Sequence, residues 1–87
     1  MEISYTDNAL KDLKYWKKIK NKEVQKRISD LLDSITETPY KGIGNPEPLK
    51  HGLTGYWSRK INKEHRIIYR LINDNTIEIY SLRLHYK

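Results

Sequence analysis

The sequence predicts an α+β domain with the element order β-α-α-β-β-β. Two segments with helical periodicity lie in the first half, and three segments rich in β-branched and aromatic residues follow one another in the second half. All four glycines lie in the loop between these halves. Helices and strands grouped in this way are typical of α+β domains. We therefore expect an N-terminal strand and a helical hairpin packed on an antiparallel sheet.

The first strand and the first helix follow each other directly. Residues 2–5 alternate between polar and apolar side chains, which predicts a short strand. Thr6 is a suitable N-cap, and Asp7 in the first turn complements the helix dipole. Apolar side chains between Ala9 and Trp16 then form one stripe of a helix, and lysines line its solvent side.

A second helix is predicted after a break at residues 20–21. Apolar side chains recur at intervals of three and four between Val24 and Ile35. The helix should end before Pro39, because a proline ring disfavours helical geometry in the residue that precedes it. The short link between the two helices predicts that they pack as an antiparallel hairpin.

A long loop and three strands complete the chain. The loop, residues 40–55, is longer than most connections, which favours a functional role. Strands are expected at Tyr56–Ile61, His65–Ile72 and Thr76–Leu84. The short turns between them predict a consecutive antiparallel meander.

The composition limits the classes of function. A chain of 87 residues has room for one domain, residues 1–87. It has no cysteine, no apolar run that could span a bilayer and no leader sequence, so we expect a soluble cytoplasmic protein without a membrane partner. The net charge is +6, and the excess of Lys and Arg lies from Pro39 onward. Such a surface favours a polyanion or an acidic protein as partner, although solubility alone would also explain it.

One carboxylate is held rigidly. Glu47 lies between Pro46 and Pro48, whose rings restrict the backbone on both sides. Cleavage of RNA without a metal needs a base for the 2′-hydroxyl, cations for the charge on the phosphorane, and an acid for the departing 5′-oxygen. Glu47, Arg66 and His85 are our candidates for these three roles, in that order.

Strand parity brings two of these candidates together. On the last strand, alternation puts on one face the residues Ile77, Ile79, Ser81, Arg83 and His85. Arg66 lies at the start of the preceding strand, and in an antiparallel pair the start of one strand lies beside the end of the next. We therefore expect Arg66 and His85 to meet at one end of the sheet.

Further cations and aromatic side chains are candidates for binding RNA. The basic candidates, for phosphates, are Lys50, Arg59, Lys60 and Arg83, and the aromatic ones, for bases, are Tyr56, Trp57 and Tyr86. Each kind also has an ordinary structural interpretation: a loop glutamate is often only solvated, a strand tryptophan is often part of the core, and strand arginines discourage aggregation at edges. The three histidines lack the spacing of metal ligands, so we expect no metal and no cofactor.

Taken together, these residues resemble the YoeB family of bacterial toxins. The specific motifs are PEPLKH at residues 46–51, WSR at 57–59, EHR at 64–66 and the closing RLHY at 83–86. The likeness extends over essentially the whole chain and includes Tyr15, Trp16, Thr38, Pro39, Tyr40, Gly42, Gly44, Leu53, Gly55, Ile61 and Tyr69.

The resemblance implies a RelE/ParE-superfamily fold and a ribosome-dependent mRNA endoribonuclease. Such toxins cut mRNA in the ribosomal A site and arrest translation. A YefM-like antitoxin, which we expect to be acidic and partly disordered, holds them inactive. The family also tends to form homodimers. Its catalytic residues correspond to Glu47, Arg66, His85 and Tyr86, and its RNA contacts include Lys50 and Arg59.

Two features differ from the family pattern. Lys60 follows Arg59 where two arginines are common, which exchanges a bidentate fork for a point charge. Lys87 extends the chain beyond the usual terminal tyrosine.

Two other functions stay open. The alternatives are a basic module that blocks the ribosome without cutting mRNA, and a gyrase inhibitor of the ParE type. Intact mRNA during arrest would indicate the first, and altered DNA supercoiling the second.

Overall fold

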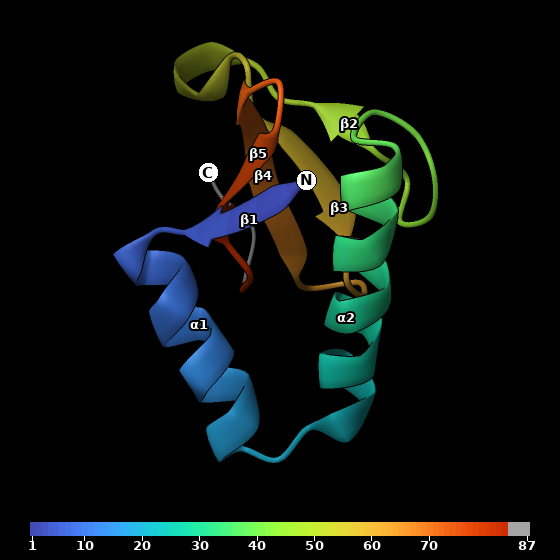
Figure 1. Ribbon diagram of the computed structural model, residues 1–87. Coiled ribbons are helices and arrows are strands. Elements are labelled where there is room, and N and C mark those ends of the chain that lie inside the picture. The colour runs from blue at the N-terminus through green and yellow to red at the C-terminus, as the bar shows by residue number, and fades with distance from the viewer. Residues whose placement is uncertain (84–87) are drawn as a thin grey trace.

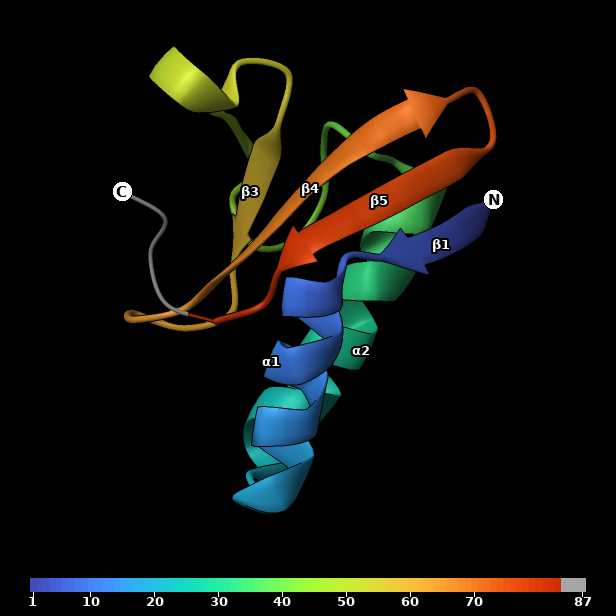
Figure 2. The ribbon, with the colours of Figure 1, turned by 90° about the vertical axis from the view of Figure 1, so that its left-hand side faces the viewer.

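The computed structural model describes residues 1–83 (Figure 1). Two helices lie on one face of a five-stranded sheet, which confirms the predicted α+β class (Figure 2). The elements are β1 (Glu2–Tyr5), α1 (Asp7–Lys18), α2 (Lys22–Glu37), β2 (Glu47–Pro48), a 3-10 helix (His51–Leu53), β3 (Trp57–Lys60), β4 (Arg66–Asn73) and β5 (Thr76–Ser81).

The sheet is mixed, whereas the sequence led us to expect an antiparallel one. The strand order is β1-β5-β4-β3-β2, and β1 pairs with β5 in parallel. The other neighbouring strands are antiparallel. The N-terminal strand therefore belongs to the sheet itself, because Glu2 N donates to the carbonyl oxygen of Asn75 (2.8 Å) and Thr6 N donates to that of Ile79 (3.1 Å).

A two-residue strand, β2, lies within the segment that we expected to be an irregular loop. Its Glu47 is opposite Ser58, and its Pro48 is opposite Trp57. β2 is an edge strand, where a proline without an N–H group interrupts no ladder. Glu47 is thus part of the sheet, which fixes its position relative to β3.

Both helices begin where the sequence indicated. Thr6 Oγ1 accepts a hydrogen bond from Ala9 N (3.0 Å), and Asn21 Oδ1 accepts one from Val24 N (3.0 Å). The helices form an open antiparallel hairpin, and the link that joins them lies at the end remote from β1 (Figure 1). Within residues 1–83, no helix combines the length and the apolar character that crossing a membrane requires.

The hydrophobic core lies between the hairpin and the sheet. Its buried side chains are Ala9 and Trp16 of α1, Val24, Ile28, Leu31 and Ile35 of α2, and Ile61, Ile67, Tyr69, Ile77, Ile79 and Leu82 of the sheet region. Leu10 falls within the predicted stripe of α1 but is 44% exposed, so the stripe is narrower than expected.

A bulge in β5 changes which side chains face the helices. It lies between the pair Tyr69 and Ile79 and the pair Ile68 and Ser81. These pairs are consecutive on β4 but skip one residue on β5, so the alternation of β5 is broken. Ser81 therefore shares a face with Ile68, and Leu82 joins the core. The prediction that Ser81 shares the face of Ile79 is wrong for this reason.

Candidate functional site

Glu47 and Arg66 meet on the outer face, the side of the sheet turned away from α1 and α2. Glu47 of β2 is opposite Ser58 of β3, which is itself opposite Ile68 of β4. Arg66 lies two residues before Ile68 and so projects to the same side. Arg66 Nη1 donates to Ser58 Oγ (3.2 Å) and lies 3.9 Å from Glu47 Oε2.

Asn45, the residue before Pro46, also holds the Glu47 carboxylate in place. Asn45 Nδ2 donates to Glu47 Oε1 at 2.9 Å. The φ angle of Asn45 is 54°, in the left-handed region that asparagine adopts more readily than most residues. Neither Asn45 nor Ser58 was among the predicted site residues. The signal for Asn45 was its place directly before a rigid Pro-Glu-Pro segment, whereas finding Ser58 requires the pairing of β2 with β3.

This arrangement leaves the Glu47 carboxylate available for chemistry. The side chain of Glu47 is 49% exposed, and that of Arg66 is 23% exposed. Their separation exceeds hydrogen-bond distance, so the guanidinium does not occupy the carboxylate. A carboxylate of this kind can take a proton from a bound hydroxyl while the neighbouring guanidinium binds a phosphate.

The two lysines predicted to bind RNA are both exposed. Lys60 of β3 is opposite Arg66 and therefore projects to the outer face, where it is exposed. Lys50 is exposed at the start of the 3-10 helix His51–Leu53, which follows β2. Lys60 can therefore contact a polyanion that lies along Glu47 and Arg66, and Lys50 lies three residues after Glu47 in the chain.

Arg59 is buried, which corrects the prediction that its side chain contacts RNA. It is 0% exposed on the helix-covered face, where no phosphate can reach it. Its guanidinium donates to Tyr69 Oη (3.1 Å), Ser34 Oγ (2.6 Å), and the carbonyl oxygens of Ile43 (3.1 Å), Thr38 (2.6 Å) and Lys41 (2.8 Å). These bonds hold the loop that leads from α2 to Glu47, so we assign Arg59 to the support of that loop.

Gly42 and Gly44 leave room for this guanidinium. Their φ angles are 122° and 84°, in the region that favours glycine. A Cβ atom on Gly42 would collide with Ser34 Oγ and lie 3.1 Å from Arg59 Nη1. A Cβ atom on Gly44 would lie 2.6 Å from Leu31 Cδ2. Gly42 and Gly44 are therefore explained by the close approach of the loop to α2 and Arg59.

Trp57 also lies on the helix-covered face. It is opposite Tyr69 in the register and packs against the core. Its ring centroid is 4.8 Å from that of Tyr40, with the rings inclined at 42°. The structure therefore does not bring Trp57 to the side of the sheet that carries Glu47.

Three further predicted residues, Arg83, His85 and Tyr86, lie at the carboxyl end. Arg83 Cζ is 3.6 Å from the ring centroid of Tyr15 on α1. Its Nε atom is buried and has no hydrogen-bond partner among residues 1–83. His85 and Tyr86 lie outside the described residues, so the expected meeting of Arg66 with His85 stays a prediction.

Helix α1 holds the backbone of Leu82, the last core residue before this end. Trp16 Nε1 donates to Leu82 O (2.9 Å), and Leu82 N donates to Asp12 Oδ2 (2.8 Å). Burial raises the pKa of Asp12, whereas the Leu82 N–H group and the charges of Arg83 and His65 act in the opposite direction.

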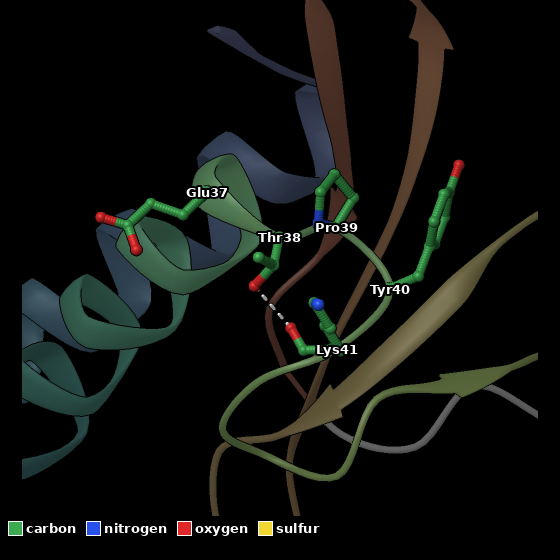
Figure 3. Close-up of a pocket in the computed structure, with 5 residues that line it drawn as sticks. All are labelled: Glu37, Thr38, Pro39, Tyr40 and Lys41. Atoms are coloured by element: carbon green, nitrogen blue, oxygen red, sulfur yellow. Dashed lines mark hydrogen bonds between the residues drawn. The ribbon is translucent and has the colours of Figure 1, made fainter.

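A pocket of about 330 Å³ lies elsewhere, at the carboxyl end of α2 (Figure 3). It is lined by Glu37, Thr38, Pro39, Tyr40 and Lys41, and the Thr38 hydroxyl donates to the carbonyl oxygen of Lys41 (2.8 Å) beside it. None of the predicted site residues lines this pocket. In the part of the chain that the structure describes, no three acidic or histidine side chains are grouped as a metal site.

Comparisons with known proteins give matches over the whole length. The family model described as the YoeB-like toxin of bacterial type II toxin-antitoxin system matches residues 5–86. Toxin YoeB of Synechocystis sp. is 45% identical over 87 residues, which is 100% of this chain and 99% of that protein.

Solved structures agree with these sequence matches. A YoeB/ParE toxin from Agrobacterium tumefaciens superposes with a TM-score of 0.92 at 36% identity, covering 99% of this chain and 100% of that one. YoeB from Staphylococcus aureus has been solved as a dimer, with a TM-score of 0.89 at 44% identity, and in a complex with YefM, with a TM-score of 0.88 at 45% identity. Each of these two matches covers 99% of this chain and 98% of the other.

Proposed function

The chain belongs to the YoeB-like toxins of bacterial type II toxin-antitoxin systems, and from this premise we propose that it is an endoribonuclease that cuts mRNA in the ribosomal A site. The observation that carries the proposal is the pairing of Glu47 with Arg66 on the outer face of the sheet, 3.9 Å apart and accessible. A general base beside a phosphate-binding cation is what cleavage through the 2′-hydroxyl requires.

The proposed reaction uses the hydroxyl of the RNA as nucleophile. Glu47 takes the proton from the 2′-hydroxyl, and the 2′-oxygen forms a bond to the adjacent phosphorus. Arg66 stabilises the negative charge that develops on the phosphorane. The bond from phosphorus to the 5′-oxygen then breaks, which leaves a 2′,3′-cyclic phosphate and a 5′-hydroxyl. We assign protonation of the departing 5′-oxygen to His85, assisted by Tyr86, and we include no metal.

The two exposed lysines add phosphate-binding groups to the proposed site. Lys60 is opposite Arg66, Lys50 lies three residues after Glu47, and both are exposed. We propose that they bind the phosphates that flank the cut. Lys60 can supply a point charge there but not a bidentate fork. Within residues 1–83, Glu47 is half exposed, so its surroundings do not enclose a substrate and fix its orientation. We therefore propose that the ribosome orients the message, because alignment alone can lower a barrier by several kcal/mol.

The partners follow from the family. The S. aureus relative has been solved with YefM and as a dimer. We propose that a YefM-like antitoxin, acidic and partly disordered, inhibits this chain by covering the basic side chains near Glu47, and that the toxin forms homodimers. A toxin that acts on ribosomes works in the cytoplasm.

The test is to add the purified protein to one message, either naked or being translated on ribosomes, and to map the new RNA ends. The proposal predicts cuts at the A-site codon in the translated sample alone. Arrest of translation with intact mRNA would contradict it and indicate a ribosome-blocking protein. Intact mRNA together with altered DNA supercoiling would instead indicate a gyrase inhibitor.

A further inference from the structure

A second group of side chains lies on the outer face beside the Glu47 and Arg66 pair. Arg70 of β4 is opposite Glu78 of β5, and Arg70 Nε donates to Glu78 Oε1 (3.0 Å). Arg70 Cζ lies 4.9 Å from the ring centroid of Tyr56, the residue before β3. The ring of Tyr56 meets that of Tyr80 edge to face, with centroids 5.3 Å apart. The guanidinium of Arg70 is thus held between a carboxylate and an aromatic ring.

The distance from the proposed cutting site follows from the strand geometry. Arg70 lies two residues after Ile68 on β4, and Ile68 is opposite the Ser58 that binds Arg66. Side chains two residues apart on one face are separated by about 6.6 Å along the strand. Arg66 itself lies four residues from Arg70, about 13 Å along the strand. Its guanidinium, however, reaches Ser58 at the level of Ile68, so the gap to Arg70 is comparable to one or two steps along an extended nucleic-acid strand. The base next to a phosphate bound at Arg66 can therefore reach Arg70.

The chemistry of this group suits a nucleobase. Bases that are unstacked from RNA stack on aromatic rings and on the flat face of arginine. The side chain of Arg70 is 42% exposed although Tyr56 lies beside it, so part of the guanidinium is accessible to a ligand. Glu78, with a side chain that is 21% exposed, fixes the orientation of that plane.

Building on the proposed function, we propose that Arg70 and Tyr56 form a stacking platform for the base of the nucleotide adjacent to the cut, and that Glu78 is a positioning residue for Arg70. An ordinary cross-strand ion pair is the competing explanation for the contact between Arg70 and Glu78. The two explanations differ because an ion pair needs a charge alone, whereas stacking needs the flat guanidinium.

The decisive variant is Arg70→Lys, which keeps the charge for Glu78 but removes the flat surface. We expect cleavage of translated mRNA to become about tenfold less efficient, as the loss of one stacking contact implies. We also expect the preference among bases next to the cut to weaken, with an unchanged melting temperature. Arg70→Met should reduce the cleavage efficiency and the base preference in the same way, although it also removes the ion pair with Glu78. The matched control is Arg27→Lys on α2, which should leave both the rate and the preference unchanged.

Efficiency and base preference are measured from the mapped ends of many codons, well below the melting temperature of each variant. Suppose that the wild type cuts normally and that Arg70→Lys and Arg70→Met have its efficiency and its base preference. This result would overturn the stacking platform but not the proposed function. A wild-type protein that cuts no translated message would overturn the proposed function as well as the platform.

Discussion

Arg66 on β4 lies 3.9 Å from Glu47 on β2, although β3 separates their two strands. Ser58 of β3 lies between them and accepts a hydrogen bond from Arg66 (3.2 Å). Because β2 has two residues, the position of Glu47 depends on the loop that precedes it, which Arg59 holds on the opposite face. The proposed chemistry therefore depends on residues on both faces of the sheet.

The first prediction concerns the buried guanidinium. Arg59→Lys keeps the charge but leaves several carbonyl oxygens of the loop without a donor, so we expect the free energy of unfolding to fall by about 3 kcal/mol. Urea unfolding followed by circular dichroism measures this change. Lys60→Ala, at the exposed neighbouring position, should change it by no more than about 0.5 kcal/mol. Equal effects of the two substitutions would show that Arg59 does not hold the loop.

The second prediction concerns the glycines of the loop. Gly44→Ala places a Cβ atom 2.6 Å from Leu31 Cδ2 at a φ angle of 84°, so we expect a loss of about 2 kcal/mol in the free energy of unfolding. Gly52→Ala is the matched control, because nothing lies within 4 Å of its Cβ position. That variant should be as stable as the wild type. A Gly44→Ala protein with wild-type stability would refute the close packing described here.

The third prediction concerns Asn45. Asn45→Gly retains the left-handed backbone but removes the amide that donates to Glu47. Since one such hydrogen bond contributes about 1 kcal/mol, we expect cleavage of mRNA on ribosomes to slow by about fivefold. The rate is measured under single-turnover conditions, and the melting temperature is recorded in parallel. A wild-type rate would show that Glu47 needs no support from Asn45.

The fourth prediction concerns the pH dependence of stability. Burial raises the pKa of Asp12 above its ordinary value of 3.8, so the unfolded chain releases this proton at a lower pH than the folded protein does. The contribution of Asp12 to stability is therefore complete below the unfolded-state pKa and is lost as the pH rises through the folded-state pKa. Asp12→Asn removes this dependence and keeps an oxygen that can accept from Leu82 N.

We therefore expect the free energy of unfolding of Asp12→Asn, relative to that of the wild type, to increase between about pH 4 and neutral pH. Urea titrations of both proteins across this range measure the difference. A difference that stays constant with pH would contradict the assignment of a raised pKa to Asp12.

Local features of the structure could be predicted from the sequence because they depend on neighbouring residues. Thr6 and Asn21 cap their helices through bonds to residues three positions away. The prolines on either side of Glu47 likewise indicate a rigid carboxylate, because each ring restricts the backbone next to it. These signals lie within one turn or one strand, where sequence patterns are most informative.

Features that depend on distant residues could not be predicted in this way. Arg59 has the same local context whether it is exposed or buried, and its partners lie at least ten positions away in the sequence. The pairing of β2 with β3 and the bulge before Ser81 decide which side chains reach the outer face. For this reason the sequence predicts that Trp57 binds RNA, whereas the structure places it on the side of the helices.

The most direct test of the catalytic proposal is the single-turnover rate of mRNA cleavage on programmed ribosomes by Glu47→Gln. This variant keeps the size of the side chain and removes its ability to take a proton. The matched control is Glu37→Gln, the same change at an exposed position at the end of α2. We predict that Glu47→Gln is slower by a factor on the order of a hundred, with an unchanged melting temperature, while Glu37→Gln cleaves like the wild type. A wild-type rate for Glu47→Gln would contradict the assignment of Glu47 as the base.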